Sequence, residues 1–187
     1  MSKRKLFIDF DSTIVDSISA FCDSYNKLYR DHPRFIPATP CKVEKWNFKD
    51  QCPLVEDTAK IFASELFFRN VDFINGNTKE IIEQLCEKYD VILITIGSLQ
   101  NIALKSMWLY DYLPCIKEHI FLVNNGCKMD KGIVDMEGDT IFIDDVDSNL
   151  KSTNAKHKII FGDIYDWNVD SQYPRAFNWT DLSRLLL

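Results

Sequence analysis

Short apolar runs limit the folds that are open to this chain. They lie at residues 5–10, 91–95, 120–123, 140–143 and 158–161. Runs without regular polar alternation are typical of strands covered on both faces, as in parallel sheets. Helical spacing of apolar residues separates several of them, for example at 79–88 and 99–110. This alternation predicts an α/β fold with a doubly wound, Rossmann-like parallel sheet.

A segment between the first strand and the rest has a different character. Residues 14–30 and 54–70 show helical spacing, and the stretch between them has prolines, aromatic residues and weak strand signals. We therefore predict a core domain made of residues 1–16 and 75–187. Residues 17–74 are predicted to form a small helical cap inserted after the first strand.

Charge and cysteine content exclude several classes of protein. The 187 residues carry a net charge of -6, which argues against binding long nucleic acid but allows a small phosphorylated substrate. No apolar run is long enough to cross a bilayer, so no membrane partner is expected. The six cysteines show no CxxC spacing. They are predicted to be free thiols, which argues against a zinc site and against a disulfide framework. Free thiols also favour a cytoplasmic location.

Polar residues stand where three of the predicted strands end. Asp9 and Asp11 follow the first strand, Thr95 ends the second run, and Asp144 and Asp145 end a later one. Ligands of open α/β sheets bind at the carboxyl ends of the strands, so these side chains should meet in one crevice. Several carboxylates in one crevice repel each other. A hard cation such as Mg²⁺, which prefers oxygen ligands, would offset that repulsion.

Each of these motifs also has an ordinary structural explanation. A DxD pair such as Asp9 and Asp11 is most often a solvated turn, and Asp144-Asp145 could simply cap a helix. Lys131, followed by a glycine, could belong to a surface turn. What points to function is the combination of acids, a hydroxyl, a lysine and acids again, in that order.

That order resembles the haloacid dehalogenase-like superfamily of phosphohydrolases. The matching segments are LFIDFDST, VILIT, Lys131 and IFIDD. A finer resemblance is to the 5'(3')-deoxyribonucleotidases, and it rests on Met129-Asp130-Lys131, Gly138-Asp139, residues 142–145 and 157–161, and Asn178-Trp179-Thr180-Asp181. The chain departs from that family's pattern at Met129, at Ser17 and at Ser12-Thr13. The nucleoside preference therefore stays open.

The resemblance implies a role for each motif residue. Asp9 would attack phosphorus and form an aspartyl-phosphate, while Asp11 would act as general acid and then general base. Thr95, Lys131 and the backbone amide of Ile96 would hold the phosphoryl oxygens. Asp9, the main-chain carbonyl of Asp11 and Asp145 would bind Mg²⁺, with Asp144 behind them or bound through water.

Aromatic residues of the predicted cap are candidates for binding a nucleobase. Trp46 and Phe48 flank Asn47 in a segment without helical periodicity, so we select them as substrate-binding candidates. The alternative is that such rings form the core of the cap.

Together, the motifs predict an enzyme, a Mg²⁺-dependent phosphomonoesterase acting on (deoxy)nucleoside monophosphates. Oligonucleotide 3'-phosphates or sugar phosphates are alternative substrates for the same motifs. A non-catalytic binding module with this fold is a further alternative, but it predicts the loss of Asp9 or Asp11, and both are present. A glycosyltransferase DxD motif would leave Thr95, Lys131 and Asp145 unexplained. The oligomeric state is not predicted.

Overall fold

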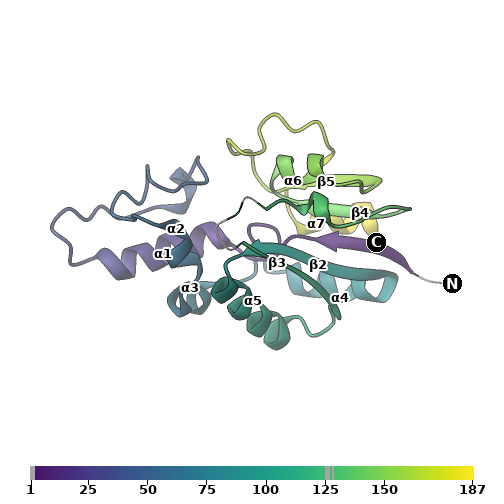
Figure 1. Ribbon diagram of the computed structural model, residues 1–187, viewed down its shortest axis with the longest axis horizontal. Helices are drawn as coiled ribbons and strands as arrows, with labels where there is room; N and C mark the ends of the chain where they lie inside the picture. The colour runs from purple at the N-terminus through teal and green to yellow at the C-terminus, as the bar shows by residue number, and fades with distance from the viewer. Residues whose placement is uncertain (1–2, 125–126, 128) are drawn as a thin grey trace.

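A parallel sheet forms the centre of the molecule. The computed structural model describes residues 3–124, 127 and 129–187, and within them the sheet has six strands in the order β3-β2-β1-β4-β5-β6 (Figure 1). The strands are β1 (Arg4–Ile8), β2 (Tyr89–Gly97), β3 (Glu118–Val123), β4 (Ile141–Asp144), β5 (His157–Phe161) and β6 (Arg175–Ala176). This confirms the predicted doubly wound parallel sheet. The pattern of apolar runs did not reveal the two-residue strand β6.

The register of the central strands aligns the predicted motifs. Ile8 pairs with Leu93 of β2 on one side and with Ile143 of β4 on the other. The backbone N–H of Asp9 continues this ladder by donating to the carbonyl of Ile143 at 3.0 Å. The order of strands reverses direction at β1, and the crevice of a doubly wound fold lies at such a point. The backbone alone therefore places the ends of β1, β2 and β4 side by side.

Helices cover both faces of this sheet. Alternate residues of β1 point to opposite faces, so Leu6 and Ile8 join one apolar cluster while Phe7 joins another. The first cluster contains residues of α4 (Thr78–Lys88), α5 (Leu99–Tyr112) and α7 (Trp179–Leu186). The second contains Leu150 of α6 (Asp147–Ser152). None of the helices in the described ranges has the length and hydropathy that a membrane span requires.

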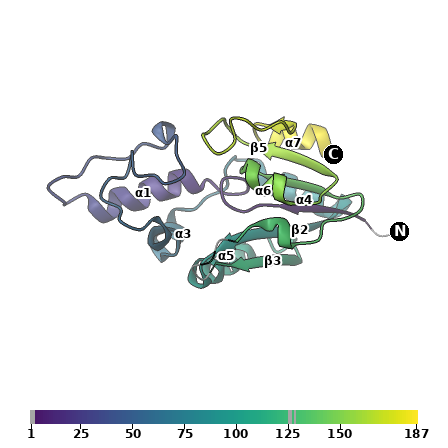
Figure 2. The same ribbon diagram turned by 45° about the horizontal axis from the view of Figure 1, so that its top comes forward.

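Residues 17–74, called the helical insertion below, stand at one end of the sheet (Figures 1 and 2). They contain α1 (Ser17–Tyr29), the 3₁₀ turn η1 (Pro40–Lys42), α2 (Thr58–Phe62) and α3 (Glu65–Asn70). Their apolar residues form a separate cluster around Phe21, Tyr25 and Phe67. The exact domain boundaries stay a prediction.

The helices of the insertion are shorter than the sequence pattern indicated. The continuous helix expected over 54–70 is wrong, because Ser64 interrupts it. The Ser64 hydroxyl accepts from the backbone N–H of Phe67 at 3.1 Å and so caps a new helix, α3. The helix expected from residue 14 begins only at Ser17, because the Asp16 carboxylate caps it by accepting from the N–H of Ser19 at 2.9 Å.

Two segments of chain connect the insertion to the sheet, and they run next to each other. Val15 forms an isolated antiparallel bridge with Phe73. The N–H of Asp16 donates to the carbonyl of Asp72, and that of Ile74 donates to the carbonyl of Ile14, both at 3.0 Å. Paired connections of this kind fix where the insertion stands over the carboxyl ends of the strands.

Candidate active site

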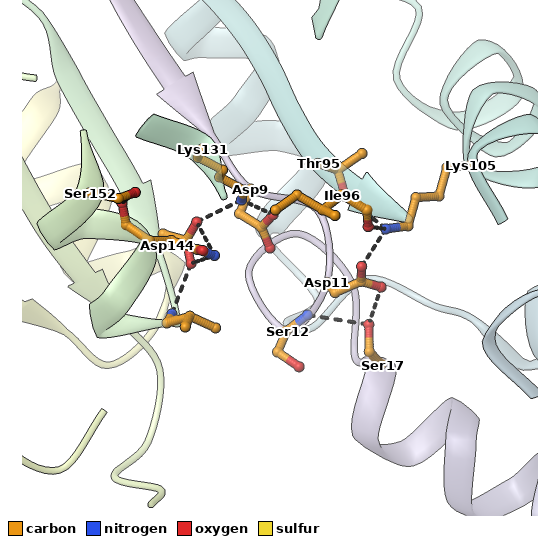
Figure 3. A network of polar contacts seen from close by, with 12 residues as sticks. Asp9, Asp11, Ser12, Ser17, Thr95, Ile96, Lys105, Lys131, Asp144 and Ser152 are labelled. Carbon is orange, nitrogen blue, oxygen red and sulfur yellow. Dashed lines mark hydrogen bonds and ion pairs between the residues drawn. The ribbon is translucent and has the colours of Figure 1, made fainter. Parts of the chain in front are cut away.

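Three carboxylates from two strands meet at the carboxyl edge of the sheet. Asp9 follows β1, Asp144 ends β4, and Asp145 follows it. One oxygen from each lies within 4.8 Å of the others, and all three side chains are buried. The sequence predicted this convergence, and the close view in Figure 3 shows Asp9 facing the end of β4.

Lys131 supplies the positive charge nearest to these acids. It lies in the 3₁₀ turn η2 (Lys131–Ile133), its side chain is 1% exposed, and its Nζ donates to Asp144 Oδ2 at 2.6 Å. The same ammonium group forms an ion pair with Asp9 (Figure 3). Burial alone would lower the pKa of Lys131, but Asp144 and Asp9 raise it above its usual value. This lysine therefore stays charged.

One lysine does not balance three buried acids. The pKa of Asp9 is raised to about 7, chiefly by burial and also by the charges of Asp144 and Asp11, against the opposing effect of Lys131. Burial, followed by the charges of Asp144 and Asp9, also raises the pKa of Asp145 well above its usual value. A site of oxygen donors that is short of positive charge fits a hard divalent cation such as Mg²⁺.

Asp144 and Asp145 have different surroundings. Asp144 accepts from Lys131, from the backbone N–H of Val146 at 2.8 Å and from Asn149 Nδ2 at 3.1 Å, so its oxygens are occupied by the protein. Asp145 lines the open cavity above the sheet. The geometry is consistent with Asp145 as the direct ligand of a cation and Asp144 as its support.

A second buried lysine, which the sequence analysis missed, holds Asp11. Lys105 of α5 forms an ion pair with the Asp11 carboxylate, and its side chain is 1% exposed. Its Nζ also donates to Thr95 Oγ1 at 2.7 Å and to the carbonyl of Ile96 at 3.2 Å (Figure 3). The hydroxyl of Ser17, at the start of α1, donates to Asp11 at 2.9 Å. Asp11 is thus fixed by both the core and the insertion.

A cavity of about 560 Å³ lies above these groups. Asp9, Asp11, Thr95, Ile96, Lys131 and Asp145 line its floor, and Trp46, Thr58, Ala59 and Phe62 of the insertion line its opposite wall. The side chain of Trp46 is 41% exposed, and its ring stacks against Phe62 with centroids 6.1 Å apart. The cavity therefore has a charged floor and an aromatic roof.

Phe48 is not part of this roof. Its ring stacks on Phe21 with centroids 4.1 Å apart, and its side chain is 2% exposed. The backbone at Phe48 has a φ of 56°, a left-handed conformation, and its ring lies in the core of the insertion, where it also contacts Trp46 with centroids 6.1 Å apart. Of the two rings selected as substrate-binding candidates, the structure therefore places Trp46 in the wall of the cavity and Phe48 beneath it in the core of the insertion.

Comparison with known proteins gives the family. The model of the family described as "5' nucleotidase, deoxy (Pyrimidine), cytosolic type C protein" matches residues 3–187. The chain belongs to this nucleotidase family. It is accordingly a phosphoric monoester hydrolase of the haloacid dehalogenase-like type.

Individual relatives agree with this family. A 5'(3')-deoxyribonucleotidase of Clostridium acetobutylicum is 24% identical over 190 residues, which cover 99% of this chain and 96% of the relative. A haloacid dehalogenase-like hydrolase of Streptococcus pneumoniae has a TM-score of 0.68, with 11% identity and 99% of both chains covered. A HAD hydrolase of Bacillus subtilis, whose structure is bound to magnesium, has a TM-score of 0.62 at 14% identity, covering 100% of this chain and 99% of that one. These structural likenesses show that the nucleotidase has the haloacid dehalogenase-like fold.

The sequence carries a signal for Lys105. This lysine is spaced three residues after Ile102 and three before Trp108, on the face of α5 that packs against the sheet. A lysine inside an apolar helical stripe needs a buried partner of opposite charge, and here that partner is Asp11. Other lining residues that were missed, among them Thr58, Phe62, Asn101 and Asn149, lie in no motif and show no comparable signal.

Proposed function

We propose that this nucleotidase hydrolyses (deoxy)nucleoside monophosphates with Mg²⁺, through an aspartyl-phosphate on Asp9. The observation that supports this most is the cavity itself: a nucleophilic carboxylate beside a buried lysine on one wall, and aromatic rings on the other. A phosphate would lie on the charged floor, and a base would lie against Trp46.

Two displacements at phosphorus would complete the reaction. Asp9 attacks the phosphorus atom, the bond to the ester oxygen breaks, and that oxygen takes a proton from Asp11. In the second step Asp11 removes a proton from water as the water attacks the aspartyl-phosphate. Inorganic phosphate leaves, and both carboxyl groups return to their starting states. Lys105 and Ser17 hold Asp11 in place beside Asp9 for these transfers.

Thr95 and Lys131 are positioned to bind the phosphoryl group. An ammonium group can only donate, so the Thr95 oxygen accepts the bond from Lys105 and its own hydrogen stays free to donate elsewhere. That hydrogen and the Lys131 ammonium, together with the Ile96 backbone amide, would bind phosphoryl oxygens. Donors held in place before the reaction stabilise the charge that develops in the transition state.

The residues around Asp9 fit a magnesium ion. Asp9, Asp145 and the main-chain carbonyl of Asp11 would hold it, with Asp144 keeping Lys131 and Asn149 in place behind. Bound Mg²⁺ would neutralise part of the phosphoryl charge as a Lewis acid. The description of a magnesium-bound HAD hydrolase of the same fold supports this assignment. A cytoplasmic location is part of the proposal, supported by six cysteines that are free thiols.

Phosphate release from a panel of monoesters tests the proposal. The panel contains deoxynucleoside and nucleoside monophosphates, sugar phosphates and a short oligonucleotide with a 3'-phosphate, each measured with Mg²⁺ and with a chelator. We expect the highest kcat/KM on a nucleoside monophosphate, and no turnover with the chelator. A sugar phosphate or the oligonucleotide as best substrate would overturn the assignment to nucleotides. Absence of release from every monoester would overturn the proposed reaction.

A further inference from the structure

Trp167 contacts the candidate cation site although it belongs to none of the sequence motifs. It belongs to the loop between β5 and β6, which extends toward the helical insertion (Figure 2). Its indole Nε1 donates to Asp145 Oδ2 at 3.0 Å. Within the described parts of the chain, this is the one side-chain hydrogen bond to the Asp145 carboxylate. The nearby Lys131 pairs with Asp9 and Asp144 and not with Asp145.

The indole ring is held on several sides. It stacks on Tyr165 with centroids 4.3 Å apart and an angle of 6° between the rings. It also meets Trp46 of the insertion edge to face, with centroids 5.3 Å apart. The backbone N–H of the neighbouring Asp166 donates to the carbonyl of Glu44 at 3.3 Å, which ties the loop to the insertion. A ring restrained in this way presents its N–H in one direction.

A fixed donor matters at Asp145 because its neighbours repel it. Asp9 and Asp144 are both acids, and the oxygens that could bind a cation lie within 4.8 Å of each other. A carboxylate without a partner would turn away from such neighbours. An indole N–H can restrain it and, having no lone pair to offer, does not compete for the cation. Partners behind a metal ligand typically change metal affinity by about 10- to 100-fold when they are removed.

We propose that Trp167 is a positioning residue that orients Asp145 for binding the divalent cation. The inference rests on the proposed Mg²⁺ dependence of the nucleotidase. It assigns a task in the reaction to the loop after β5, a segment that carries none of the catalytic groups.

Magnesium binding measured by calorimetry on the full chain, without substrate, tests this role. Trp167→Phe keeps an aromatic ring between Tyr165 and Trp46 but removes the N–H, so we expect the Kd for Mg²⁺ to rise about 10-fold. The matched control is Trp108→Phe, the same substitution at a buried tryptophan whose ring packs on Phe10 and Phe73. This control should keep the wild-type Kd.

The outcomes separate the two hypotheses. A wild-type chain that binds no Mg²⁺ contradicts the proposed metal site, whereas equal Kd values for wild type and Trp167→Phe contradict only the role of Trp167. Activity gives a second readout. Raising Mg²⁺ to saturation should restore kcat in Trp167→Phe to within about 3-fold of wild type, because a less well oriented Asp145 lowers the affinity for Mg²⁺ and saturation compensates for that loss.

A measurement on the unmodified chain covers the case in which Trp167→Phe does not fold. The protein has four tryptophans, and their indole N–H groups give separate signals in a ¹⁵N–¹H spectrum. Single substitutions of the other three identify the signal of Trp167 by elimination. We expect Mg²⁺ to shift this signal more than that of Trp108. A Trp167 signal that Mg²⁺ leaves in place would overturn the inference.

Discussion

The carboxyl edge of the sheet and the helical insertion face the same cavity but are built in different ways. At the edge, Asp9, Thr95 and Lys131 are almost completely buried, and each is bonded to another polar side chain. In the insertion, Trp46 is 41% exposed and contacts its neighbours through its ring. Strand pairing fixes the positions of the residues at the carboxyl ends of the strands. The positions of the insertion residues that line the cavity depend on the packing of short helices and loops.

The difference separates two tasks. Groups fixed by the backbone of the sheet are suited to chemistry, which slows by about 100-fold when a reacting group is misplaced by about 1 Å. Groups held by side-chain packing are suited to selecting a substrate. Changes at the edge should therefore lower kcat, and changes in the roof should raise KM.

The largest expected effect is at the proposed nucleophile. Asp9→Asn removes the anionic oxygen that attacks phosphorus, so we expect kcat for phosphate release to fall by at least about 1,000-fold. The thermal unfolding midpoint measured with a chelator should not fall, because the variant removes one of three mutually repelling acids. Near wild-type turnover in a folded Asp9→Asn protein would contradict the mechanism.

Lys131 should give the next largest effect. Lys131→Met keeps much of the side-chain volume but leaves Asp9 and Asp144 without their shared cation. We expect kcat to fall by about 100-fold, with a smaller change in KM, as for the loss of a transition-state donor. The comparison variant is Lys105→Met, which leaves Asp9 and Asp144 paired with Lys131. If the two variants had the same effect on the thermal stability and on kcat, the two lysines would not have the separate roles assigned to them.

The roof should respond through substrate binding. Stacking of a base on an aromatic side chain contributes about 1–3 kcal/mol, so Trp46→Ala should raise KM for a nucleoside monophosphate by about 10-fold. Its kcat should stay within about 3-fold of wild type. Phe48→Leu is the matched control, since Phe48 packs in the core of the insertion: it should lower the unfolding midpoint and leave KM unchanged. An unchanged KM in Trp46→Ala would remove this ring from the substrate site.

The last expected effect concerns the pH dependence of stability in the metal-free protein. The pKa of Asp9 is raised from 3.8 to about 7 in the folded state, so the folded protein binds a proton more tightly than the unfolded chain. This group therefore lowers the free energy of unfolding as pH rises from about 4 to about 7. Thermal unfolding with a chelator should show this decline, and Asp9→Asn should reduce it. A decline of equal size in both proteins would contradict the raised pKa.

The sequence predicted the edge better than the roof, for a physical reason. A buried strand is a continuous apolar run, so the positions of Asp9 and Asp144 at strand ends could be inferred from the residues alone. Their meeting point follows from parallel pairing. Thr95 was expected to end its strand but lies two residues before the end of β2 at Gly97. Apolar spacing alone does not mark Lys105, because a lysine inside an apolar stripe becomes a signal only through its need for a buried partner of opposite charge.

The insertion was harder to predict because helix caps and side-chain packing, rather than a regular apolar pattern, decide where its helices begin and which rings are buried. Ser64 caps a new helix just after α2 has ended at Phe62. Trp46 and Phe48 looked equivalent in the sequence but differ in burial, at 41% and 2% exposed. Trp167 lies in a loop without periodicity, and its contact with Asp145 joins residues 22 positions apart. Such contacts arise from tertiary packing, which a pattern along one chain does not record.

The parallel direction of the strands has a practical consequence. All strands of the sheet run in one direction, and β1, β2, β3 and β4 end next to the cavity, so the starting ends of these strands lie on the side away from it. Both ends of the described chain lie on that side (Figure 1): Lys3 donates to the carbonyl of Cys86 at 2.9 Å, and Tyr89 donates to the carbonyl of Leu186, also at 2.9 Å. An affinity label, a dye or a solid support attached at either terminus would therefore leave the mouth of the cavity open, which makes the protein suitable for immobilised assays.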